Sequence, residues 1–159
     1  MFARPFIDSV DFARNGKEIR GVIAVSELPR LGDFLAKPGG SLSYIVSGFR
    51  EGDSNMLGIS LQGACTLRCQ RCLGELEYPV DMTLRLLLLP ADRLDEVEDD
   101  DDVEAIEAEL RLDVLALIEE EMLLELPFAP KHPDGECAPA MNDLQQKASP
   151  FAVLAGLKK

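Results

Sequence analysis

The sequence has no long apolar run, and its first residues do not resemble an export signal. None of its apolar stretches approaches the roughly 18 residues that a membrane-spanning helix needs. The opening stretch MFARPFIDSV lacks the apolar core of a signal peptide. We therefore expect a cytoplasmic protein that makes no membrane contact and whose thiols are reduced.

The residue patterns of common catalytic sites are also missing. The chain has a single histidine, His132, and contains neither a glycine-rich phosphate loop nor a nucleophile elbow. One histidine leaves little for general-base catalysis. The carboxylates are many, but they gather in a charged stretch that offers no pair in fixed geometry. We therefore expect that the protein is not an enzyme.

Negative charge is concentrated in one region of the chain. Of the 29 acidic residues, 16 lie within 92–125, where only Arg93 and Arg111 oppose them. The densest part is an acidic loop at about 92–104, which is too charged to pack. At its centre are Asp99, Asp100, Asp101 and Asp102. The loop is either a solubilising segment or a contact for a strongly basic partner such as a ribosomal protein, and its charge disfavours non-specific nucleic-acid binding there.

Apolar residues alternate with polar ones in several segments, which predicts β-strands. The segments are EIRGVIAV, LSYIV, LGISLQGACTL, VDMTLRLLLL and AIEAELRL. Gly, Pro and Asn turn signals between the first four favour antiparallel neighbours. The segment SELPRLGDFLA suits a short helix. The segment VLALIEEEMLLEL predicts a longer helix, with Asp113 as its cap, Pro127 at its end, and Glu119 to Glu121 mostly toward water.

These elements predict an α+β fold with a single domain. We expect a mostly antiparallel, curved and barrel-like sheet with one main helix packed on it. The domain should span residues 1–140, and residues 141–159 should form a linker and a short amphipathic helix. Its apolar positions, Phe151, Leu154 and Leu157, recur every three residues. Such a short helix is not stable alone, so we expect it to dock on its own domain or on a partner.

The four cysteines divide into two kinds. Cys65 shares its parity with the apolar residues of a strand, so we expect it in the core. Cys69 and Cys72 form a Cys-x-x-Cys pair at the end of that strand, which is half of a tetrahedral zinc site. The best candidates for the other half are His132 and Cys137. The alternative is a set of reduced thiols beside a turn and an ordinary loop histidine.

A redox role for Cys69 and Cys72 is a further alternative. A thioredoxin-type pair places its nucleophilic cysteine at a helix N-terminus, where the helix dipole lowers the thiol pKa. The residues after Cys72, LGELEYPV, run instead into Pro79 and a strand. The sequence therefore favours metal binding over thiol-redox chemistry for this pair.

Several segments together resemble a known family. They are LRCQRCLGELEYPVDMTLRLLLLP, the acidic stretch, DVLALIEEEMLLELPFAPKH with a following cysteine, and SPFAVLAGLKK. In this order they are similar to the YceD family, the large ribosomal RNA subunit accumulation proteins. The resemblance implies a non-enzymatic ribosome biogenesis factor involved in the synthesis, processing or stability of 23S rRNA. Some relatives carry a second Cys-x-x-Cys near the C-terminus, where this sequence has only His132 and Cys137.

The resemblance and the segregated charge together suggest partners. We expect a ribosomal protein or a large-subunit assembly factor as the partner, with the acidic loop attracting a basic ribosomal protein, and 23S rRNA or its precursor is a second candidate. Positive charge outside the acidic region gives the candidate contacts for RNA or for another factor. These residues are Arg68, Arg71 and Arg85.

Overall fold

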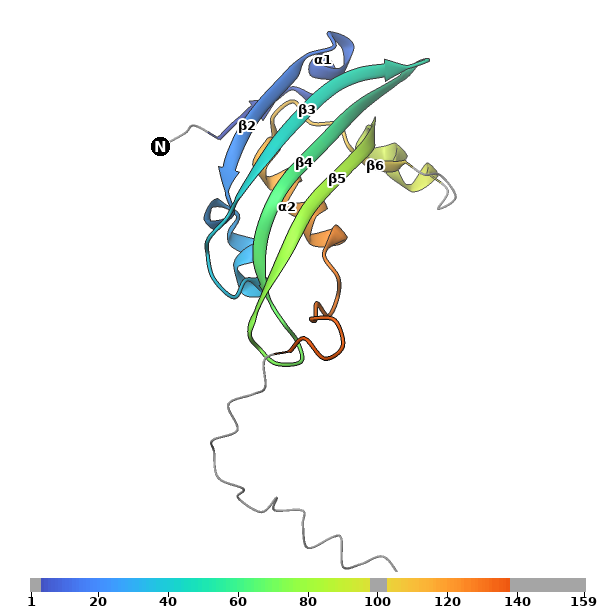
Figure 1. The fold of residues 1–159 in the computed structure, drawn as a ribbon. Coiled ribbons are helices and arrows are strands. Elements are labelled where there is room, and N and C mark those ends of the chain that lie inside the picture. Colours follow the sequence, from blue (N-terminus) through green and yellow to red (C-terminus); the bar gives the residue numbers. More distant parts are fainter. Residues whose placement is uncertain (1–3, 98–102, 138–159) are drawn as a thin grey trace, which may run out of the picture.

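The computed structural model describes residues 4–97 and 103–137, which form a five-stranded sheet with α2 behind it (Figure 1). The strands are β1 (Phe6–Ile7), β2 (Glu18–Ala24), β3 (Ser41–Glu51), β4 (Ser54–Arg68), β5 (Glu75–Leu89), β6 (Glu104–Glu107) and β7 (Leu112–Asp113). The helices are α1 (Ser9–Arg14) and α2 (Val114–Glu125), and the 3₁₀ turns are η1 (Val25–Glu27), η2 (Pro29–Phe34) and η3 (Ala91–Glu96).

The main sheet has the strand order β2-β3-β4-β5-β6, and β1 and β7 form a separate small pair. Its first three pairings are antiparallel, while β5 and β6 are parallel. The prediction of an α+β fold with a mostly antiparallel sheet is therefore confirmed. The prediction of a barrel-like sheet is wrong, because β2 and β6 are two open edges that do not pair. Alternating polarity is the same in an open sheet and in a barrel, so the pattern could not distinguish them.

One face of the sheet carries the core, and α2 packs against it. Along β4, Leu57, Ile59, Leu61, Cys65 and Leu67 are all buried, and the residues between them face outward. This confirms the predicted alternation and the core position of Cys65. The sheet face opposite α2 is turned toward the viewer in Figure 1 and carries no helix of the described residues. The cysteine turn between β4 and β5 lies at one end of this sheet.

The helix α2 begins and ends as the sequence predicts. The Asp113 carboxylate accepts hydrogen bonds from the backbone N–H groups of Leu115 and Ala116, at 3.0 and 3.1 Å. The helix ends at Glu125, two residues before Pro127, and the residue before that proline is extended. The prediction that Glu119 to Glu121 face water is wrong for two of the three, because Glu119 is 3% and Glu121 4% exposed.

The burial of Glu119 has a clear reason. Its carboxylate accepts hydrogen bonds from the backbone N–H groups of Arg30 and Leu31, at 2.5 and 3.1 Å. These groups lie in the first turn of η2, where backbone donors have no partner within the turn. The predicted short helix over this segment is therefore two 3₁₀ turns, and a distant carboxylate satisfies the donors of the second.

The helix α1 was not predicted, because only a few of its residues are apolar and it is short. The Asp8 carboxylate caps it, and Phe12 and Ala13 are buried against the sheet. Gly48 of β3 lies directly beneath, where a Cβ atom would collide with the carbonyl of Phe12. The strand predicted over AIEAELRL is also shorter than expected, since it ends at Glu107 and the chain turns before β7.

Two sets of predicted residues lie outside the described part of the chain. They are Asp99, Asp100, Asp101 and Asp102 of the acidic loop, and Phe151, Leu154 and Leu157 of the C-terminal segment. The predicted division at residue 140 is likewise untested. Within residues 4–97 and 103–137, no helix is long and apolar enough to cross a membrane.

Candidate metal centre

The Cys-x-x-Cys pair lies in the tight turn that joins β4 to β5. Within the turn, the N–H of Leu73 donates to the carbonyl of Cys69 at 2.9 Å, and the N–H of Cys69 donates to the carbonyl of Gly74 at 3.0 Å. Leu73 has a φ of 60°, a left-handed conformation that is uncommon for leucine. These bonds close the turn and direct the thiols of Cys69 and Cys72 toward one point.

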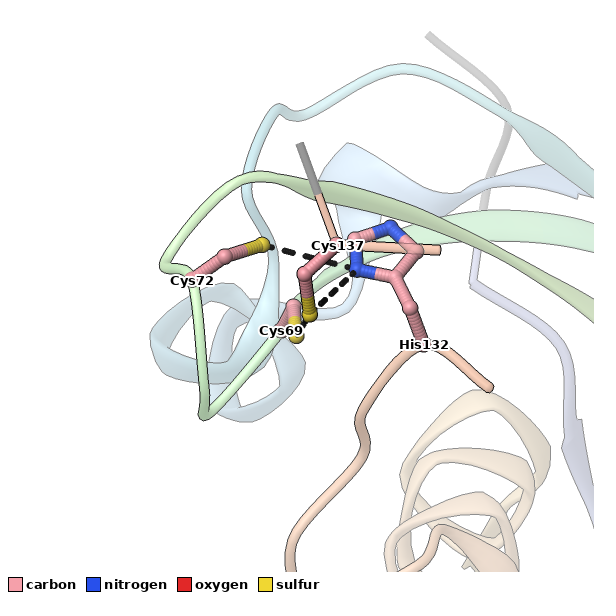
Figure 2. Close-up of side chains that lie close together, drawn as sticks. All are labelled: Cys69, Cys72, His132 and Cys137. Carbon is pink, nitrogen blue, oxygen red and sulfur yellow. Dashed lines mark hydrogen bonds between the residues drawn. The ribbon is translucent and has the colours of Figure 1, made fainter. Parts of the chain in front are cut away.

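The segment that follows α2 brings two further donors to this point. Figure 2 shows Cys69 and Cys72 on the turn and His132 and Cys137 on the later segment, with their side chains converging. The three Sγ atoms and a ring nitrogen of His132 all lie within 4.8 Å of one another. The structure thus brings together all four residues that the sequence proposed as metal ligands.

The distances agree with tetrahedral coordination. The Sγ atoms of Cys69 and Cys137 are 3.8 Å apart. The Nδ1 atom of His132 is 3.5 Å from Sγ of Cys72 and 3.7 Å from Sγ of Cys137. Around a zinc ion with bonds of about 2.3 Å to sulfur and 2.0 Å to nitrogen, tetrahedral angles give about 3.8 Å between sulfurs and about 3.5 Å between sulfur and nitrogen. The four side chains could therefore hold a metal ion with little rearrangement.

The orientation of His132 also suits a ligand. Its Nε2 atom lies 2.9 Å from the backbone carbonyl of Glu75. A carbonyl oxygen only accepts, so Nε2 carries the proton and Nδ1 presents its lone pair to the sulfurs. Metal-bound histidines are commonly fixed in this way by a hydrogen bond from their other nitrogen.

The turn also stabilises negative charge on Cys69. Burial alone would raise the pKa of this thiol, but backbone N–H groups of Cys72, His132 and Arg71 donate to its sulfur and lower the pKa to about 5. Burial raises the pKa of Cys137, and its contacts with the sulfurs of Cys69 and Cys72 raise it further. Cys69 therefore carries a thiolate readily and Cys137 does not, and a bound cation would offset the cost of ionising Cys137.

Arg71 joins the two halves of the cluster. Its guanidinium donates to the carboxylate of Asp134 at 2.9 Å and to the carbonyl of His132 at 2.5 Å. The N–H of Gln70 adds a hydrogen bond of 2.8 Å to the carbonyl of Pro130. Sequence reasoning assigned Arg71 to partner contact and did not predict its hydrogen bonds to Asp134 and His132. The sequence did contain a hint of this contact, because an arginine lies between the two cysteines and an aspartate lies two residues after the histidine.

The other two predicted contact arginines lie apart from each other. Arg68 is exposed at the end of β4, while Arg85 lies opposite Gly58, ten residues back along that strand. At about 3.4 Å per residue this separates them by about 30 Å. Arg85 forms an ion pair with Glu51 and lies over the ring of Phe49, 5.8 Å from its centroid. The three arginines therefore do not form one basic patch.

Comparison with protein families identifies the chain. The family described as large ribosomal RNA subunit accumulation protein YceD matches residues 57–158. The chain belongs to the YceD family. The match begins in β4 and includes the cysteine turn, α2 and the segment that carries His132 and Cys137. No solved structure matches the chain.

Membership of the YceD family confirms the resemblance drawn from the sequence and connects the chain with accumulation of large-subunit ribosomal RNA. The family description also links the chain with the large ribosomal subunit or its RNA, without naming a specific partner. The family description itself concerns a cellular process and no chemical reaction. In the described part of the chain, the best-defined candidate site is the cluster formed by Cys69, Cys72, His132 and Cys137.

Proposed function

We propose that this protein is a non-enzymatic, cytoplasmic factor of ribosome biogenesis that supports the synthesis, processing or stability of 23S rRNA. The observation that carries the proposal is the YceD family match over residues 57–158. In this role the protein acts by binding. Its partners are a ribosomal protein or a large-subunit assembly factor, and 23S rRNA or its precursor is a further candidate.

The direct test is the level of 23S rRNA in cells that lack the protein. We expect the ratio of 23S to 16S rRNA to fall in the deletion strain and to recover when the wild-type gene is restored. Capture of the tagged protein at low and high salt would then identify its partners. An unchanged ratio, together with no ribosomal protein, assembly factor or 23S precursor captured at low salt, would count decisively against the proposal.

We further propose that the four-residue cluster binds structural zinc. A site with four protein ligands is closed and leaves no open position for a substrate, which is typical of structural zinc and agrees with a non-enzymatic role. Cys69, Cys72, His132 and Cys137 would hold the ion, whose charge would stabilise the three thiolates. The hydrogen bonds of Arg71 and of the Glu75 carbonyl orient the ligands.

Metal analysis of the purified protein tests this assignment. We expect about one zinc ion per chain by mass spectrometry, and its loss in Cys69→Ser. Cys65→Ala is the matched control, because Cys65 is buried in the core away from the cluster. Equal zinc content in Cys69→Ser and wild type would refute the site.

The low pKa of Cys69 is the one observation that favours the alternative of a thiol-redox protein. Cys69 is, however, fully buried, and β5 rather than a helix follows the cysteine turn, starting at Glu75. Reactive cysteines are usually accessible and placed at helix N-termini. Rapid formation of a Cys69–Cys72 disulfide in metal-loaded protein under mild oxidant would support the alternative, and its absence supports a structural role.

A further inference from the structure

A second site lies away from the cysteine cluster, between α2, β6 and the start of β7. It is a cavity of about 520 Å³. Five glutamates line it, namely Glu104, Glu107, Glu109, Glu120 and Glu121. Apolar side chains line it as well, among them those of Ile106, Leu112 and Leu117. We call this the acidic cavity.

The side chain of Glu121 is what distinguishes this cavity from an ordinary acidic surface. The residue is 4% exposed, and its pKa shift arises from burial and like charges, with no hydrogen bond or ion pair to any residue in the described part of the chain. Among the described residues, the fully enclosed polar side-chain atom without a partner is Oδ1 of Asn55, so the carboxylate of Glu121 reaches the solvent of the cavity. A largely buried carboxylate without a protein partner is costly, so folded proteins normally pair such groups. The contrast is Glu119, two residues earlier, whose side chain is 3% exposed and whose carboxylate accepts two backbone hydrogen bonds.

The surroundings of Glu121 leave its charge unbalanced. Burial raises its pKa to about 7, and the nearby carboxylates of Glu104 and Glu120 add to the effect. Among the described residues that line the cavity, the one basic residue is Arg111, whose guanidinium lies over the ring of Phe6, 4.5 Å from its centroid. An external cation in the cavity would offset the charge of Glu121.

The shape of the site favours a particular kind of cation. Among the described residues, the cysteine cluster is the one group of metal-type ligands close enough to share an ion, so these carboxylates do not form a divalent-metal site. A lining that combines apolar side chains with several carboxylates fits arginine or lysine, which carry an apolar stem and a charged tip. The excess of acidic over basic residues in the lining would attract a basic segment and repel phosphate.

We propose that the acidic cavity is a docking site for an arginine- or lysine-bearing segment of a basic protein, and that Glu121 pairs with the inserted side chain. The inference deepens the proposed function, since it identifies the face that would bind a basic ribosomal protein or assembly factor. It also separates this face from any RNA contact, which the same charge would oppose.

The test uses a fluorescently labelled arginine-rich peptide and the full-length protein, with binding followed by anisotropy at low salt. We expect Glu121→Gln, which keeps the size of the side chain, to weaken binding by about tenfold or more, as loss of a buried charge partner does. Glu104→Gln should also weaken binding, and it provides a second variant at an exposed position. Glu77→Gln on the exposed surface of β5 removes the same charge outside the cavity and should change affinity about twofold or less.

Three results would overturn the docking site. They are no peptide binding by the wild type, equal loss of affinity in Glu121→Gln and Glu77→Gln, and equal binding of a small polyamine, which would make the cavity a site for small cations. The outcome is independent of the proposed function, which the 23S rRNA ratio tests. A second combination of results is that the peptide binds in a Glu121-dependent way while deletion of the protein leaves the 23S to 16S ratio unchanged. That pair of results would support the docking site and reject the biogenesis role.

Discussion

Substitution of Glu121 by glutamine should stabilise the protein at neutral pH and lose this effect in acid. The pKa of Glu121 is raised from an ordinary value of 4.5 to about 7 by burial and by neighbouring carboxylates. Between these values the folded protein binds more protons than the unfolded chain, so its stability falls as pH rises. The cost is largest above the folded pKa and absent below the unfolded one. Glutamine carries no charge, so the variant does not have this electrostatic cost.

The size of the effect follows from the shift. Each pKa unit corresponds to about 1.4 kcal/mol, so the full shift is equivalent to about 3 kcal/mol. The carboxylate borders an open cavity, where solvent screens part of this, and we expect about 2 kcal/mol. The amide of glutamine also needs hydrogen bonds, but that cost does not change with pH. The gain of Glu121→Gln over wild type should therefore increase by about 2 kcal/mol between about pH 4 and pH 8.

Urea unfolding followed by circular dichroism measures this difference, since the chain has no tryptophan for fluorescence. Both proteins carry the same cysteine cluster, so pH effects on metal binding cancel in the comparison. Glu77→Gln, on the exposed surface of β5, is the control and should stay within about 0.5 kcal/mol of wild type at every pH. A difference between Glu121→Gln and wild type that is constant across the pH range would refute the reasoning.

Three further predictions concern other parts of the structure. Chelation of the metal should leave the sheet folded but loosen the segment after α2, so that trypsin cuts at Lys131 faster; unchanged digestion would contradict a bracing role for the metal. Glu119→Ala should lower the free energy of unfolding by about 2 to 4 kcal/mol, because two backbone donors of η2 lose their acceptor, and a loss below about 0.5 kcal/mol in urea unfolding would contradict this. Leu73→Gly should raise thermal stability by about 0.5 to 1 kcal/mol, because glycine adopts a positive φ without strain; a lower melting temperature would show that the exposed leucine makes a stabilising contact.

The sequence predicted which four residues come together in the cysteine–histidine cluster, because its evidence lay in residue types. A Cys-x-x-Cys pair at a strand end needs two more donors, and His132 and Cys137 were the best remaining candidates. The geometry that supports the cluster could not be predicted in the same way. The carbonyl of Glu75 and the N–H of Gln70 are backbone groups that any residue could provide, so they leave no mark in the sequence.

The fold was predicted best where a single face is buried. The strands β3, β4 and β5 alternate clearly because one side of the sheet meets α2 and the other meets water. The helix α2 was placed correctly, but the orientation of Glu119 and Glu121 was not. A run of three glutamates normally marks a solvated face, whereas here η2 packs against Glu119 and Glu121 lines the acidic cavity beside β6. Such contacts depend on tertiary packing and have no local pattern.

The position of Cys137 gives the cysteine cluster a role in the layout of the whole chain. Cys137 is the last described residue, and it is held against Cys69 at the tip of the β4–β5 turn. The segment that follows α2 is therefore fastened at its far end to the turn that joins two neighbouring strands. A bound metal would strengthen this connection, because one ion would hold residues from both segments. Loss of the metal would then free the segment between α2 and Cys137 while the strands of the sheet stay paired.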